Sequence, residues 1–208
     1  MTTAKDVNVW RVETGHVSGA FDSPRANGDL ISRYTLTARV LHWALGFALL
    51  LSFCLGLYMA NLPLSPLQLR LYAWHKWAGI IILSLSPLRL AVRVSRRPPA
   101  DVPMPAWQRQ AAHATHGLLY LLFFLVPLTG WAYTSAAGFP VVLFGMQQLP
   151  DFLTADRELA QAIKPWHEWL AKLLALTVVG HVAAALKHHF IDRDHLLSRM
   201  WFNTRKAR

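Results

Sequence analysis

Four apolar stretches, each long enough to cross a lipid bilayer as a helix, constrain the fold of this chain more than any other feature. A helical span needs about 20 residues, and each stretch is rich in Leu, Ala, Val and Ile. Apolar and polar residues do not alternate, which argues against the strands of a membrane barrel. The sequence therefore predicts an all-α integral membrane protein, a four-helix bundle with spans at about 40–60, 71–92, 113–133 and 166–186.

The composition agrees with a membrane protein and argues against two other classes. Charged residues make up 15% of the 208 residues, against about 25% in soluble domains. The net charge of +10 lies in short basic clusters between the apolar runs, which is typical of topology signals and not of a nucleic-acid-binding face. Cys54 is the one cysteine, so an internal disulfide is excluded.

Lys and Arg residues outside the spans are distributed unequally between the two sides of the membrane. They concentrate in the N-terminal tail, in the loop between the second and third spans, and in the C-terminal tail. Because positively charged loops stay in the cytoplasm, both termini are expected to be cytoplasmic. The opposite side carries Arg70, Lys76, Arg157 and Lys164, which either steer an anionic partner or only keep the surface soluble.

The connections indicate one membrane domain flanked by two tails. Residues 33–201 are expected to form the membrane domain, residues 1–32 a mobile cytoplasmic tail, and residues 202–208 a basic C-terminal tail. On the outer side, Thr154 is expected to cap a short helix over about 155–164. Pro165 would then lie in the first turn of the fourth span.

Four histidines are predicted to lie at two depths in the membrane. His75 and His167 each begin a span on the outer side, whereas His42 begins the first span on the inner side. His181 follows His167 by fourteen residues, nearly four turns, so both leave one helix face about 21 Å apart. Haem iron takes axial imidazoles from opposite sides of the ring. We therefore expect two haem irons, one held by His75 and His167 and one by His42 and His181.

Other interpretations of the histidines stay open. Each expected ligand could instead be a hydrogen-bonded side chain within the bundle, and His116 is an alternative inner ligand. If it is not a ligand, His116 is expected to contact a haem propionate, a quinone or the cytoplasmic loop. His188 and His189 either handle protons for a quinone or snorkel to the membrane surface. Lys172 lies within the fourth span on a different face from the ligands, and its partner is either a quinone or another helix.

An arginine and three glycines lie at the same depths as the expected ligands. Arg89 lies at the inner depth of the second span, where a haem propionate or a quinone oxygen would compensate its charge. Gly46 and Gly79 each follow an expected ligand by one turn, and Gly56 lies at the outer depth of the first span. Glycines there leave room for a flat porphyrin, although small residues also let membrane helices pack closely.

The order of these motifs resembles the bacterial cytochrome b561 family, which is related to the cytochrome b subunits of nickel hydrogenases. The resemblance covers about residues 33–201 and implies a bundle with two b haems, bound from the first, second and fourth helices by the same four histidines. It also implies a bacterial inner-membrane location and a quinone partner, since members are known that oxidise superoxide and reduce ubiquinone. The motifs are Arg39-Val-Leu-His42-Trp43, His75-Lys-Trp-Ala-Gly79, His116-Gly-Leu-Leu-Tyr120, Trp166-His167-Glu168 and Gly180-His181-Val-Ala-Ala.

Three functions are compatible with these observations. The first is a di-haem oxidoreductase that passes electrons between an outer donor, such as superoxide or a protein, and membrane quinone. The second is an electron-relay subunit of a separate dehydrogenase or hydrogenase. The third is a haem-free, histidine-lined metal transporter or channel, although the spans lack the carboxylates expected of a cation path.

Overall fold

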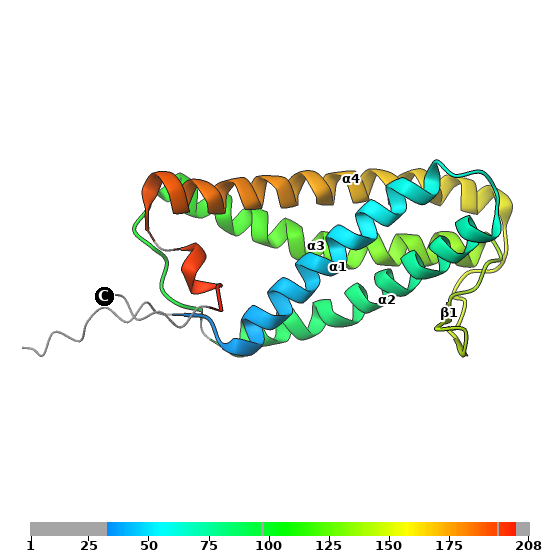
Figure 1. Ribbon diagram of the computed structural model, residues 1–208, viewed down its shortest axis with the longest axis horizontal. Coiled ribbons are helices and arrows are strands. Elements are labelled where there is room, and N and C mark those ends of the chain that lie inside the picture. The colour runs from blue at the N-terminus through cyan, green and yellow to red at the C-terminus, as the bar shows by residue number, and fades with distance from the viewer. Residues whose placement is uncertain (1–32, 97, 195, 203–208) are drawn as a thin grey trace, which may run out of the picture. The chain divides into compact units, whose positions relative to one another are not determined.

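The computed structural model describes residues 33–96, 98–194 and 196–202, which form a bundle of four long helices (Figure 1). The helices are α1 (Leu36–Ala60), α2 (Pro66–Ser95), α3 (Ala106–Ala136) and α4 (Arg157–Lys187). All four are long and apolar enough to cross a membrane, which confirms the four expected helices. The expected N-terminal tail, 1–32, and the last residues of the C-terminal tail, 203–208, lie outside the described residues.

Side-chain caps explain where two of the helices begin. The Thr35 hydroxyl accepts the backbone N–H of Ala38 at 3.3 Å and so caps α1. The Ser65 hydroxyl accepts the backbone N–H of Gln68 at 3.2 Å and so caps α2. Pro66 follows as the first residue of α2, where its missing N–H costs nothing. Such caps satisfy amides that have no partner inside the helix.

The expected short helix before the fourth span is not a separate element, because α4 is continuous. Asp156 caps α4 in place of Thr154, since its carboxylate accepts two backbone N–H groups at 2.9 and 3.1 Å. Pro165 lies inside α4 and not in its first turn. Its fixed φ is compatible with a helix, so a long, well-packed helix tolerates the loss of one hydrogen bond.

Successive helices alternate in direction and pack against their neighbours in the sequence (Figure 1). Close backbone contacts join α1 to α2, α2 to α3 and α3 to α4, whereas α1 and α4 share few. We call the end with the α1–α2 and α3–α4 connections the outer end and the opposite end the inner end. Apolar side chains from all four helices form the core, namely Leu45, Ile82, Leu119, Leu122, Phe123 and Leu174.

Large apolar side chains cover the outside of the helices. Phe47 is 70% exposed, Leu50 63% and Leu176 69%, which is the pattern of a lipid-facing surface and not of a soluble one. The helices contain 25 to 31 residues and are therefore about 38 to 47 Å long. They extend beyond a hydrocarbon core of about 30 Å, so both ends of the bundle reach the interfacial region.

A short hairpin lies in the outer connection between α3 and α4. Its strands β1 (Val142–Leu143) and β2 (Gln147–Gln148) pair antiparallel. Two side chains of α2 hold this connection in place. Lys76 Nζ donates to two backbone carbonyls of segment 139–140, at 3.3 and 3.1 Å, and Trp77 Nε1 donates to the carbonyl of Val142 at 2.6 Å.

After α4 the chain turns back across the inner end through a π-helical turn (His188–Asp192) and a 3₁₀ turn (Leu197–Arg199). The returning segment reaches the start of α1. There Trp43 Nε1 donates to the carbonyl of Met200, and a guanidinium N–H of Arg39 donates to that of Trp201, both at 2.9 Å. These bonds tie α1 to the C-terminal segment.

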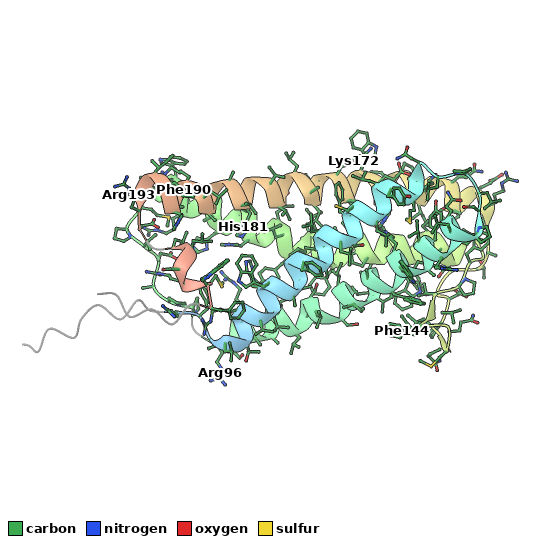
Figure 2. The ribbon with its side chains drawn as sticks, in the orientation of Figure 1. Arg96, Phe144, Lys172, His181, Phe190 and Arg193 are labelled. Atoms are coloured by element: carbon green, nitrogen blue, oxygen red, sulfur yellow. The ribbon has the colours of Figure 1, made fainter. Side chains whose placement is uncertain are left out.

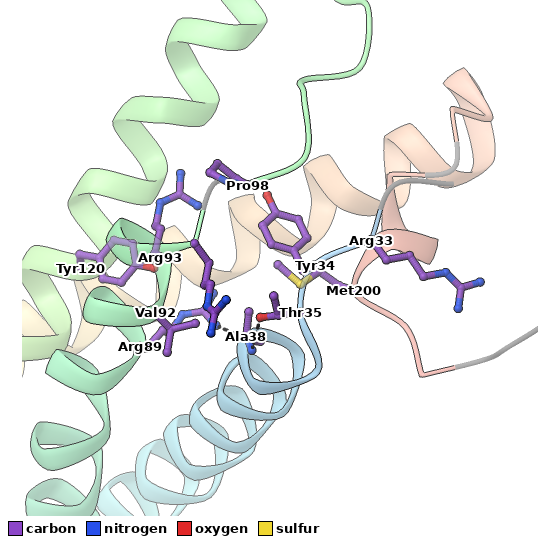
Figure 3. Close-up of a pocket in the computed structure, with 11 residues that line it drawn as sticks. Arg33, Tyr34, Thr35, Ala38, Arg89, Val92, Arg93, Pro98, Tyr120 and Met200 are labelled. Atoms are coloured by element: carbon purple, nitrogen blue, oxygen red, sulfur yellow. Dashed lines mark hydrogen bonds between the residues drawn. The ribbon is translucent and has the colours of Figure 1, made fainter. Parts of the chain in front are cut away.

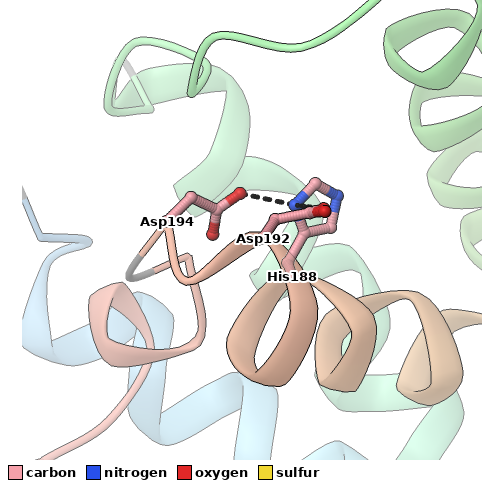
Figure 4. Close-up of side chains that lie close together, drawn as sticks. All are labelled: His188, Asp192 and Asp194. Atoms are coloured by element: carbon pink, nitrogen blue, oxygen red, sulfur yellow. Dashed lines mark hydrogen bonds and ion pairs between the residues drawn. The ribbon is translucent and has the colours of Figure 1, made fainter.

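An ionic network fixes the turn after α4 (Figure 4). Nδ1 of His188 contacts a carboxylate oxygen of Asp194 and lies 3.2 Å from one of Asp192. Lys187 Nζ lies 2.7 Å from the Asp192 carboxylate. The two carboxylates are therefore compensated by side chains of the same segment, which accounts for the network as a structural feature.

Candidate functional site

His75 on α2 and His167 on α4 face each other towards the outer end of the bundle. Their ring centroids are 6.1 Å apart, and the ring planes are inclined by 84°. Both residues are half-buried. The structure thus brings together the two histidines that the sequence analysis paired at the outer level.

Each outer histidine has one ring nitrogen close to a backbone carbonyl of another helix. His75 Nδ1 lies 3.0 Å from the carbonyl oxygen of Ser52 on α1, and His167 Nδ1 lies 3.0 Å from that of Val126 on α3. A carbonyl only accepts, so each Nδ1 carries the hydrogen and donates it. The Nε2 atom of each neutral ring then keeps its lone pair, which is the form that binds a metal.

A glycine follows each of these carbonyls by one helical turn. A Cβ at Gly56 would lie 3.2 Å from Cε1 of His75, and a Cβ at Gly130 would lie 2.9 Å from Cε1 of His167. Glycine therefore lets each imidazole approach the carbonyl that orients it. Gly130 and the two carbonyls were not predicted from the sequence. What the two sites share is a glycine four residues after the residue that supplies the carbonyl, Gly56 after Ser52 and Gly130 after Val126.

Three histidines meet towards the inner end. The ring centroids of His42 and His181 are 6.1 Å apart, with planes inclined by 71°. Those of His116 and His181 are 5.4 Å apart, with planes inclined by 66°. The side chain of His181 points from α4 into the bundle (Figure 2). The expected pair and its alternative ligand are therefore neighbours in one cluster.

Arg89 joins this inner cluster from α2. Its Nη2 lies 3.0 Å from Nδ1 of His42, and its Nη1 lies 3.4 Å from the carbonyl oxygen of Ala38. A guanidinium only donates, so this contact requires a lone pair on Nδ1 of His42 and a hydrogen on Nε2. Metal binding through Nε2 requires the opposite tautomer, in which case Arg89 must turn to another acceptor.

An apolar layer separates the two histidine levels. Leu174 lies seven residues from both His167 and His181, hence about 10 Å from each along α4. Leu174 belongs to the buried cluster, together with Leu45 of α1 and Ile82 of α2. The residues of this buried cluster are all apolar, and the half-buried Tyr120 packs against them.

The two pairs fit axial coordination of a haem iron. Bonds of about 2 Å to the metal, plus about 1 Å from each nitrogen to its ring centre, place two axial imidazole centroids about 6 Å apart. Both expected pairs have a separation of 6.1 Å. A Cβ at Gly46 or Gly79 would meet nothing within 4 Å, so the space beside both glycines is open, as a flat ring requires.

Other residues from the sequence analysis lie apart from the two histidine clusters. Lys172 points outward from α4 (Figure 2), and its Nζ lies 4.9 Å from the ring centroid of Trp169 on the same helix. His188 contacts the carboxylates at the end of α4. His189 is exposed and contacts the ring of Phe190, with 4.7 Å between the centroids.

Comparison with known proteins shows similarity over nearly all of the described chain. Residues 33–203 match the model of the prokaryotic cytochrome b561 family. The chain is 34% identical to the Escherichia coli (strain K12) protein "Cytochrome b561 homolog 2", over 81% of this chain and 90% of that protein. It is 31% identical to "Cytochrome b561 homolog 1" of the same organism, over 82% and 97%. It is 33% identical to "Probable superoxide oxidase CybB" of Yersinia pestis, over 61% and 72%.

Proposed function

Because the chain belongs to the prokaryotic cytochrome b561 family, and is therefore a membrane cytochrome b that transfers electrons, we propose that it holds two b haems. In this proposal electrons pass from a donor at the outer end, through the outer and then the inner haem, to a membrane quinone. Haem iron supplies the chemistry, since it gains and loses single electrons.

The observation that carries the proposal is the equal separation of the two histidine pairs. His75 and His167 would bind one iron, and His42 and His181 the other, because each pair has its ring centroids 6.1 Å apart. Four side chains from three helices thus form two similar sites at two levels. With both pairs committed to iron, the four histidines would hold the haems, and these would supply single-electron chemistry without a substrate bound to the metal.

The chain's own residues orient the outer ligands for this role. The carbonyls of Ser52 and Val126 hold the Nδ1–H of His75 and His167, which leaves the Nε2 lone pair of each ring available to iron. Such a hydrogen bond fixes the ring and makes it a stronger donor to iron. Ordering these side chains before the cofactor binds reduces the entropy lost on binding.

At the inner level we assign Arg89 to a haem propionate. When Nε2 of His42 binds iron, Nδ1 carries a hydrogen and no longer accepts from Arg89, so the guanidinium needs an anionic acceptor. His116 is the third imidazole of this cluster, and we assign it to the edge of the inner haem or to the quinone head group and not to the iron. The separation of its ring from His181, 5.4 Å, is shorter than that of the two proposed ligand pairs.

Superoxide is the donor that we propose for the outer end. One relative is named a probable superoxide oxidase, and superoxide is a small anion that positive charge attracts. Arg157 and Lys164, together with one carboxylate, Asp156, line a hollow of about 540 Å³ between the outer ends of α3 and α4. Lys164 precedes the proposed ligand His167 by three residues, and its Nζ lies 3.9 Å from the exposed carboxylate of Glu168. Lys76, by contrast, binds backbone carbonyls of the outer connection.

The setting of the protein follows from the same proposal. Residues 33–201 would be the membrane domain, placed in a bacterial inner membrane with both termini in the cytoplasm. The outer end would then lie on the side of the membrane opposite the cytoplasm, where the protein would meet superoxide. The inner end would lie near the bound quinone. The lipid bilayer would surround the helices and would also contain the quinone.

Stopped-flow absorbance spectroscopy of the purified haem-loaded protein tests this function. We expect superoxide to reduce the b-type bands and a short-chain ubiquinone to reoxidise them. Normal b-type bands that superoxide does not reduce would overturn the proposed donor and favour the relay subunit of a separate dehydrogenase or hydrogenase. The absence of b-type bands from a sample expressed with sufficient haem would favour the haem-free transporter.

A further inference from the structure

A small basic cavity lies at the inner end of the bundle, beside the inner histidine cluster, with which it shares Arg89 (Figure 3). Its volume is about 60 Å³, and its walls come from α1, α2, α3 and the C-terminal segment. Arginine and tyrosine side chains form its polar lining. Those on which the inference rests are Tyr34, Arg89, Arg93, Arg96 and Tyr120.

The three arginines occupy one face of α2 and its C-terminal end. Arg93 and Arg96 follow Arg89 by four and seven residues, which is the spacing of neighbours on one side of a helix. None of the described residues that line the cavity carries a carboxylate. Among the residues that the structure describes, neither Arg93 nor Arg96 forms an ion pair. Like charges gathered in this way repel one another unless an anion lies between them.

We propose that this cavity binds a phosphate group, presented by an anionic phospholipid of the inner leaflet. A water molecule needs about 10 to 15 Å³ of such space, so the cavity has room for a polyatomic anion. The planar, five-donor guanidinium matches two phosphate oxygens at once. The hydroxyl groups of Tyr34 and Tyr120 add further donors.

The position of the cavity favours a lipid over a free anion. It lies where α2 leaves the membrane, and basic pockets between helices on the cytoplasmic side are sites for anionic lipid head groups. Apolar side chains of the same helix turns face outward beside it. Leu90 is 37% exposed and Val94 79% exposed, so an acyl chain could run along α2 while the head group occupies the cavity.

This inference needs the membrane setting but not the proposed haem pairs or substrates. Arg89 is shared with the inner histidine cluster, so a test should leave it unchanged. Arg93 and Arg96 belong to the cavity alone in our assignment. The two proposals can therefore fail independently. The lipid titration tests the cavity, and the haem spectrum tests the haem pairs.

Native mass spectrometry of the delipidated, haem-loaded full chain tests the proposal. The protein is titrated with phosphatidylglycerol, with phosphatidylcholine and with inorganic phosphate. We expect the double variant Arg93→Gln/Arg96→Gln to bind phosphatidylglycerol about 30-fold more weakly than wild type, because each arginine near an anionic lipid contributes roughly a factor of five. Phosphatidylcholine should bind weakly to both proteins.

Arg109→Gln is the matched control, since Arg109 is exposed on α3 and does not line the cavity. It should bind phosphatidylglycerol like wild type. All variants should keep the wild-type haem spectrum, and Arg93→Lys/Arg96→Lys should recover part of the affinity. Unchanged phosphatidylglycerol binding in the Gln double variant would overturn the site. If inorganic phosphate binds wild type as tightly as the lipid does, and the variant loses both, the site is for free phosphate and the lipid assignment is wrong.

Discussion

At the scale of single residues, the orientation of His167 depends on the hydrogen atom that Gly130 carries in place of a side chain. A methyl group there would lie 2.9 Å from the imidazole, closer than real contacts allow. We expect Gly130→Ala to displace the ring, weaken its bond to the Val126 carbonyl and lower the occupancy of the outer haem. Haem content per chain should fall from two towards one, as measured by the pyridine haemochrome assay.

His167→Ala is the reference for this prediction, because it removes the imidazole that a Cβ at position 130 would meet. Gly130→Ala should lower the occupancy of the same haem that His167→Ala removes, and the other haem should keep its wild-type midpoint potential. Wild-type haem content in Gly130→Ala, or loss of the other haem, would contradict the role of Gly130.

Arg89 leads to a second prediction at this scale. Replacing it by Gln removes a positive charge beside the inner haem, and that charge favours the reduced form. We expect the midpoint potential of one haem to fall by about 60 mV, a tenfold change for a one-electron couple. A redox titration followed in the visible bands measures this. Arg109→Gln should leave both potentials unchanged, and a fall in both haems of Arg89→Gln would show that Arg89 does not act locally.

The sequence predicted the histidine pairs but not the groups that orient them. His181 follows His167 by fourteen residues, so the two lie on one face of a helix at two depths. The spacing within a single helix was therefore enough to predict where these two histidines lie. The contact of His167 with Val126 and Gly130 joins α4 to α3. It depends on how the two helices are rotated against each other, and no single-helix pattern contains that information.

At the scale of elements, the start of α4 shows how a cap is chosen. Both Thr154 and Asp156 are capping residue types, but the Asp156 carboxylate accepts two backbone N–H groups. We expect Asp156→Ala to lower the free energy of unfolding by about 1 kcal/mol, measured by thermal unfolding in detergent.

Thr154→Ala serves as the comparison for this prediction. It should change the free energy of unfolding by less than about 0.5 kcal/mol. A larger loss in Thr154→Ala than in Asp156→Ala would support the separate short helix that the sequence analysis expected. Composition and spacing alone could not show which of the two residues caps α4, because the backbone angles at the turn decide which side chain reaches the free N–H groups.

At the scale of the whole molecule, the distribution of Lys and Arg predicts that the outer connection and the inner loop lie on opposite sides of the membrane. Cys54 is replaced by Ser, and single cysteines are then introduced as Gln147→Cys in β2 and Gln110→Cys at the inner end of α3. We expect a membrane-impermeant maleimide to label Gln147→Cys in intact cells and Gln110→Cys only after permeabilisation. The reverse pattern would invert the orientation and place the proposed superoxide site in the cytoplasm.

The fold at this scale was predictable because lipid allows so few alternatives. Each of the four apolar stretches must satisfy its own backbone hydrogen bonds, and a helix is the way a single span does so. The bounds were less predictable, since every helix begins several residues before its expected apolar span, in a stretch that contains polar residues. The outer hairpin and the turn after α4 have no apolar periodicity, and the sequence analysis did not foresee them.

The most direct test of the account is the haem content of four variants, His42→Ala, His75→Ala, His167→Ala and His181→Ala, against wild type. Haem per chain and the near-infrared magnetic circular dichroism of bis-histidine iron are measured together. We predict two bis-histidine haems in wild type and loss of the same haem by both members of each pair. Removal of different haems by His42→Ala and His181→Ala, or by His75→Ala and His167→Ala, would contradict the account.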